Sequence, residues 1–108
     1  MDDIEVRDRV RRFAERACAA MPVRQVILFG SYAKGTATEE SDIDVAVVTD
    51  APVDDWLESS ATLYRIGGDI DLAIEPHLLN PQSDRIGFLA HVRRTGEVIY
   101  DRDAEEAA

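Results

Sequence analysis

Residues 28–48 decide the fold of this chain, and they read LFGSYAKGTATEESDIDVAVV. A Gly-Ser corner, Gly30 and Ser31, ends one apolar run, and after ten further residues Asp42 and Asp44 open another. With background residue usage, Gly-Ser-x10-Asp-x-Asp should arise by chance in roughly one chain of this length in a thousand. This spacing therefore indicates a functional site formed by the Gly-Ser corner and the aspartate pair.

The corner has the form of an anion-binding turn. The segment Gln25–Phe29 is short, apolar and β-prone, and it stops at a glycine, as a buried strand would. A short helix can start at Ser31 and reach Lys34, so that backbone N–H groups and the Ser31 hydroxyl would face an anion. Gly30 leaves room for a phosphate to approach the main chain closely.

The aspartate pair opens the next expected strand. Successive side chains of a strand alternate faces, so Asp42 and Asp44 share one face and the intervening apolar residues face the other. Two carboxylates about 7 Å apart along a strand can jointly ligate hard cations, and magnesium is usually held by one or two carboxylates plus substrate phosphates. An unpaired charge between Ile43 and Val45 would be costly, which argues against a merely solvated Asp44. The geometry suits a nucleoside triphosphate with magnesium.

A third carboxylate is available in the segment Asp69–Ile74, which follows an expected turn at Gly67-Gly68. Acidic or small residues alternate there with apolar ones, so we expect a strand with Asp69 and Asp71 on one face. If this strand pairs beside that of the aspartate pair, Asp71 can complete the three carboxylates needed around two metals for in-line nucleotidyl transfer. Asp69 competes for this role, and Glu75 is expected to be an exposed strand end or an outer member of the site.

These motifs resemble a minimal nucleotidyltransferase (MNT) domain of the DNA polymerase β-type superfamily, specifically the antitoxin half of HEPN/MNT toxin–antitoxin pairs. The resemblance runs from about residue 23 to residue 100 and rests on Gly30-Ser31, Asp42/Asp44, the strand of Asp71 and the closing GEVIY of residues 96–100. Lys34 departs from the pattern, because the family often has Arg there. Lys keeps the charge but loses bidentate phosphate geometry.

The resemblance implies an α+β fold, in which helices flank a small mixed, largely antiparallel β-sheet. It also implies a magnesium-dependent transfer of AMP from ATP to a tyrosine of a cognate HEPN ribonuclease toxin. The expected metal ligands and catalytic residues are Asp42, Asp44 and Asp71, holding two magnesium ions, and the expected nucleotide-binding residues are Gly30, Ser31 and Lys34. Two alternatives stay open: an antitoxin that acts by binding only, and a small-molecule nucleotidyltransferase subunit.

The charge distribution narrows the choice of partner. Net charge is −10, and there is no Lys or Arg between Gly35 and Tyr64. Long nucleic acid would be repelled from such a surface, because its affinity rests largely on basic contacts to phosphate. A metal-bound triphosphate tolerates the charge and a basic protein surface would be attracted by it, although net charge can also serve solubility alone.

The remaining pattern predicts one domain over residues 1–108, with helices at about 2–20, 53–66 and 81–94 and a frayed tail at 101–108. The arginines of the first helix are matched by acids, so we expect a solvated face, and Trp56 is expected in the core. Cys18 is expected to be a buried thiol, and His77 and His91 structural or surface residues. The absence of an apolar span and of a signal sequence predicts a cytoplasmic protein.

Overall fold

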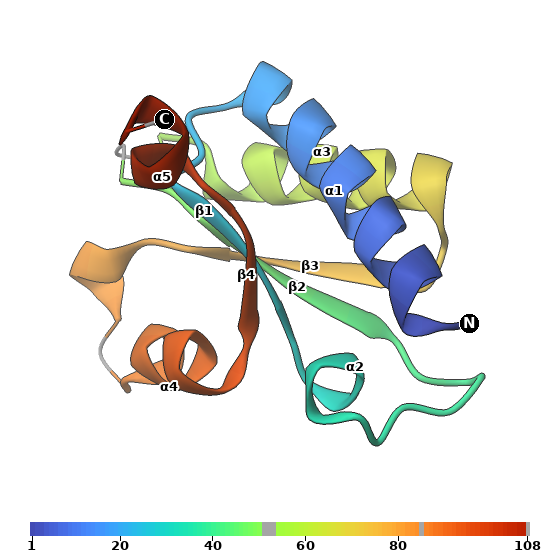
Figure 1. Ribbon diagram of the computed structural model, residues 1–108. Helices are drawn as coiled ribbons and strands as arrows, with labels where there is room; N and C mark the ends of the chain where they lie inside the picture. Colours follow the sequence, from blue (N-terminus) through green and yellow to red (C-terminus); the bar gives the residue numbers. More distant parts are fainter. Residues whose placement is uncertain (51–53, 85, 108) are drawn as a thin grey trace.

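The computed structural model describes residues 1–50, 54–84 and 86–107. Helices lie on both faces of one four-stranded sheet (Figure 1). The elements in chain order are α1 (Asp3–Ala20), β1 (Gln25–Phe29), α2 (Ser31–Lys34), β2 (Ile43–Val48), α3 (Trp56–Ile70), β3 (Ile74–Leu79), the 3₁₀ turn η1 (Pro81–Ser83), α4 (Phe88–Thr95), β4 (Glu97–Asp101) and α5 (Arg102–Ala107).

The sheet is mixed, with the strand order β3-β2-β1-β4. Strand β1 runs antiparallel to both β2 and β4, and β2 runs parallel to β3. The predicted α+β fold with a small, largely antiparallel sheet is confirmed. The pairing brings the end of β1 and the start of β2 together, because Phe29 lies opposite Asp44.

The alternation of β2 divides the core into two layers. Ile43, Val45 and Val47 belong to the larger cluster, which α1 and α3 cover. Ala46 and Val48 face the other side and pack with Leu89 and Val92 of α4. Asp44 shares this second face, as predicted from the two-residue period.

Helix α1 begins where the sequence predicts, because Asp2 caps it by accepting a hydrogen bond from the Glu5 backbone N–H at 2.8 Å. Its arginines are not simply a solvated face. Arg7 binds Glu97 of β4 through both carboxylate oxygens, at 2.5 and 2.8 Å. Two further ion pairs join α1 to the C-terminal end of α3: Arg9 with Asp71, and Arg16 with Asp69 at 3.1 Å.

The segment around Gly67-Gly68 differs from the prediction. Helix α3 does not turn there but continues to Ile70, and the strand expected at residues 69–74 starts only at Ile74. A Cβ on Gly67 would lie only 3.0 Å from Cγ2 of Ile74, so Gly67 allows α3 to pack closely on β3. Pro76 is tolerated within β3 because this strand lies at the edge of the sheet. The expected helix start at Val53 lies outside the described residues.

The C-terminal part also differs from the prediction. The helix expected at residues 81–94 is split into η1 and α4 at Gly87, whose φ is +72°. The tail expected to be frayed contains the end of β4 and α5, where Arg102 binds Asp50 at 2.6 Å. Trp56 is not a core residue, since it is 45% exposed. No helix in the described ranges is long and apolar enough to cross a bilayer.

Candidate functional site

The corner between β1 and α2 is built around Gly30. Its backbone has φ 74° and ψ −150°, a conformation that glycine adopts readily and other residues avoid. A Cβ added there would overlap the Asp44 carboxylate. Ser31 begins α2 and is half-buried, whereas Lys34 ends this helix as an exposed residue. The glycine therefore lets the α2 corner lie directly against the first carboxylate of β2.

Two of the three expected carboxylates lie where the sequence places them. Asp44 is the second residue of β2, half-buried, and Asp42 precedes the strand as an exposed residue. Asp44 lies in register with Phe29 on one side and with Glu75 on the other. The aspartate pair thus lies between the Gly30 corner and strand β3.

The third carboxylate at this place is Glu75, not Asp71. Glu75 and Asp42 line the same cavity. A hydrogen bond between the two carboxyl groups, which requires a proton on one of them, is the largest cause of a raised Glu75 pKa, and partial burial and the charge of Asp44 add to it. Two carboxyl groups that share a hydrogen bond repel each other when both are ionised. A cation placed among them would remove that repulsion.

Asp71 is held elsewhere. It is the residue that ends α3, its side chain accepts a hydrogen bond from the Ala73 N–H at 2.8 Å, and Arg9 pairs with it. Asp69, the expected competitor, pairs with Arg16. The expectation that a strand brings Asp71 beside the aspartate pair is wrong, because α3 extends through the glycine pair and the next strand starts later.

His77 is the second site residue that the sequence analysis missed. Its Nε2 lies 3.4 Å from Oδ1 of Asp44, and its ring packs against the rings of Phe29 and Phe88, with centroids 5.1 and 6.4 Å away. The aromatic contacts hold the imidazole so that it faces Asp44. The alternation of Glu75, His77 and Leu79 along one strand face was the available signal, and Pro76 within it obscured the strand.

The donor set fits a divalent cation. Ligand atoms of Asp44, Glu75 and His77 all lie within 4.8 Å of one another. The carboxylate oxygens are ligands that magnesium prefers, and Asp42 adds a further carboxylate through its contact with Glu75. Asp44, Glu75 and His77 could therefore hold a metal ion between β2 and β3, with Asp42 beside Glu75.

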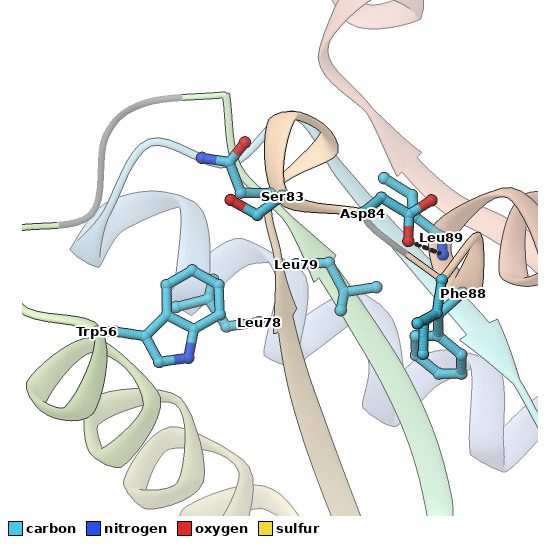
Figure 2. A pocket seen from close by; sticks show the side chains of 9 residues that line it. Trp56, Leu78, Leu79, Ser83, Asp84, Phe88 and Leu89 are labelled. Carbon is cyan, nitrogen blue, oxygen red and sulfur yellow. Dashed lines mark hydrogen bonds between the residues drawn. The ribbon is translucent and has the colours of Figure 1, made fainter.

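One cavity borders the carboxylates, and a second lies further along β3. The first, of about 400 Å³, lies between α3 and the start of β3, and both Asp42 and Glu75 line it. The other, of about 350 Å³, lies at the far end of β3 and is lined mainly by apolar side chains (Figure 2). Trp56 and Phe88 lie on opposite sides of this second cavity, and Asp84 beside it accepts a hydrogen bond from the Leu89 N–H at 3.0 Å.

A glycine corner beside carboxylates at adjacent strand starts is the arrangement of a nucleotidyl-transferring domain. In agreement, the sequence matches the family described as Polymerase beta, Nucleotidyltransferase over residues 15–105. The chain belongs to this family. Two relatives from Methanocaldococcus jannaschii are both named as protein adenylyltransferases. One is 35% identical over 79 residues, covering 72% of this chain and 79% of the relative, and the other is 34% identical over 82 residues, covering 71% and 82%.

Solved structures share the fold. A protein from Sulfolobus solfataricus described as a nucleotidyltransferase aligns with a TM-score of 0.69 at 18% identity, covering 94% of this chain and 85% of that one. A toxin–antitoxin structure with AMP-PNP gives 0.65 at 21%, covering 90% and 77%. A complex of tri-AMPylated Shewanella oneidensis HEPN toxin with MNT antitoxin gives 0.62 at 17%, covering 98% and 78%. At these identities the likeness establishes the fold alone.

Proposed function

We propose that this protein transfers AMP from ATP to a tyrosine hydroxyl of a cognate HEPN ribonuclease toxin and so acts as its antitoxin. The observation that carries the proposal is the contiguous set of Asp42, Asp44 and Glu75 beside the Gly30 corner. The names of the relatives support a protein acceptor, and the toxin–antitoxin neighbours support the kind of partner.

Each residue of the site has a proposed task. The backbone at Gly30 and the Ser31 hydroxyl bind the triphosphate, and Lys34 adds a positive charge near it. Asp42, Asp44 and Glu75 would hold two magnesium ions, which would supply charge neutralisation for the phosphates and polarise the α-phosphate. Glu75 also accepts the proton of the attacking hydroxyl, because it lies on the β3 side of Asp44, opposite the Gly30 corner. His77 orients Asp44.

The acceptor is proposed to be a protein because the surface is acidic around the site. The stretch from Gly35 to Tyr64 has no basic residue, so it attracts a basic protein and repels long nucleic acid. The alternative of an antitoxin that acts by binding only predicts neutralisation without modification. The alternative of a small-molecule nucleotidyltransferase subunit predicts transfer without any HEPN partner. A cytoplasmic location stays a prediction.

The test is the intact mass of the HEPN partner after incubation with this protein, magnesium and ATP. We expect one or more additions of AMP, and none with Asp44→Asn, which keeps the shape of the side chain but removes its charge. A toxin that is neutralised without any change in mass would refute the transfer and favour binding alone.

A further inference from the structure

The order of the strands divides the site into two sides. Gly30 follows β1, Asp44 lies on β2 and Glu75 lies on β3, so the triphosphate corner and Glu75 flank Asp44 from opposite sides. Displacement at phosphorus places the attacking and leaving oxygens roughly in line. A triphosphate bound on the β1 side therefore leaves the β3 side for the acceptor.

The cavity of about 400 Å³ opens on this acceptor side. Asp42 and Glu75 line it together with Tyr64, Gly68 and Leu72 from α3 and the turn that follows. Leu72 is 90% exposed and Tyr64 52% exposed, although both are large apolar or aromatic side chains. Exposed apolar groups next to carboxylates that need a substrate point to a binding surface that continues from the site.

We propose that this cavity receives the side chain of a tyrosine flanked by basic residues on the partner protein, with Tyr64 and Leu72 against the ring and Glu75 at the hydroxyl. This inference rests on the proposed function and deepens it. A tyrosine side chain has an apolar body and a polar tip, which match the apolar wall and the acidic end of the cavity. Serine and threonine lack the body that would reach Leu72. The basic flanks follow from the acidic sequence of residues 35–64, which contains no Lys or Arg.

The transfer of AMP to the tyrosine needs no reactant other than ATP. The tyrosine oxygen forms a bond to the α-phosphorus of ATP, and the bond from that phosphorus to the oxygen bridging to the β-phosphate breaks. Pyrophosphate leaves with that oxygen. The hydroxyl proton leaves on the cavity side and ends in solvent.

Gly68→Ala tests the cavity without loosening the fold. Gly68 lies within α3, and an added Cβ would meet Cδ2 of Leu72 at 3.7 Å, an ordinary contact distance. Alanine has a higher helix propensity than glycine, so the variant should melt at the same or a higher temperature. The methyl group narrows the cavity, so KM for the HEPN partner should rise about tenfold. KM for ATP should not change.

Leu72→Ser removes apolar wall at a highly exposed position and should also raise the KM for the partner. Leu57→Ser is the matched control, because Leu57 lies near the other end of α3 and is 80% exposed. We expect this control to act like the parent protein. All three variants should keep the thermal stabilisation that magnesium-ATP gives to the parent, and mapping of the modified partner should find AMP on tyrosine.

The outcomes separate this inference from the proposed function. Parent-like transfer by both Gly68→Ala and Leu72→Ser overturns the inference and leaves the transferase standing. AMP on a serine or threonine overturns the inference together with the tyrosine acceptor of the proposed function, and leaves only the transfer of AMP to the partner standing. A smaller magnesium-ATP stabilisation in these variants also overturns it, because the cavity would then hold the nucleotide. If the parent binds the partner without transfer, the proposed function fails. Calorimetry of partner binding then tests the cavity as a docking surface. Binding that is unchanged by Leu72→Ser overturns the inference, and weakened binding supports it.

Discussion

Replacing Gly30 with alanine should damage both the stability and the nucleotide site. The residue has φ 74° and ψ −150°, where a non-glycine residue costs on the order of 1–3 kcal/mol. The added Cβ would also overlap the Asp44 carboxylate, which must then move. We expect a total loss of about 3 kcal/mol in the free energy of unfolding. For a domain of this size, that corresponds to a melting temperature lower by roughly 15 °C.

Gly35→Ala is the matched control, because Gly35 has φ 78° but a Cβ there would meet no atom within 4 Å. It should lose only about 1 kcal/mol from backbone strain. The contribution of the overlap can be isolated by repeating Gly30→Ala in an Asp44→Ala background, where about 1 kcal/mol of the loss should disappear. Thermal melting with and without magnesium-ATP is measured for the parent, the two glycine variants, Asp44→Ala and the double variant Gly30→Ala/Asp44→Ala. A Gly30→Ala protein that is as stable as Gly35→Ala and still stabilised by magnesium-ATP would refute the assigned contact.

Two further predictions concern charge. The double variant Asp42→Asn/Asp44→Asn should fold, because it removes two carboxylates that repel Glu75 and raise its pKa. Magnesium-ATP should no longer raise the melting temperature of this variant. A rise as large as that of the parent would contradict the assigned metal site. Arg7 lowers the pKa of Glu97, so the pair stabilises the fold above the ordinary glutamate pKa near 4.5 and this contribution is lost as pH falls below it. Because Glu97 is partly exposed, the contribution of the ion pair to the free energy of unfolding should stay below about 1 kcal/mol. The difference in melting temperature between the parent and Glu97→Gln should therefore shrink between about pH 5 and pH 3. A difference that stays constant over this range would contradict the prediction.

The first half of the site could be predicted because local sequence determines it. A β-prone run that stops at Gly30, and two aspartates at strand spacing, specify a corner and a shared face without any long-range information. Alternation alone placed Ile43 and Asp44 on opposite faces, and the two core clusters confirm it.

The third carboxylate depended on tertiary contacts that the sequence pattern does not report. Gly67-Gly68 has the composition of a turn, but α3 continues through it because Gly67 lets the helix pack on Ile74. This continuation moves the strand from Asp71 to Glu75. Asp71 then serves structure, paired with an arginine from α1 that lies far away in the sequence. Pro76 could be recognised as a strand residue only once β3 was known to be an edge strand.

The most direct test of the account compares Glu75→Gln with Asp71→Asn in AMP transfer to the HEPN partner, each variant keeping the shape of the side chain. Glu75 lies among the site carboxylates, whereas Asp71 is held by Arg9 and the Ala73 N–H. We predict that Glu75→Gln lowers the transfer rate by at least about a hundredfold, as expected for loss of a proton acceptor. Asp71→Asn should transfer within a fewfold of the parent and melt at a lower temperature. Loss of transfer in Asp71→Asn together with normal transfer by Glu75→Gln would contradict the account.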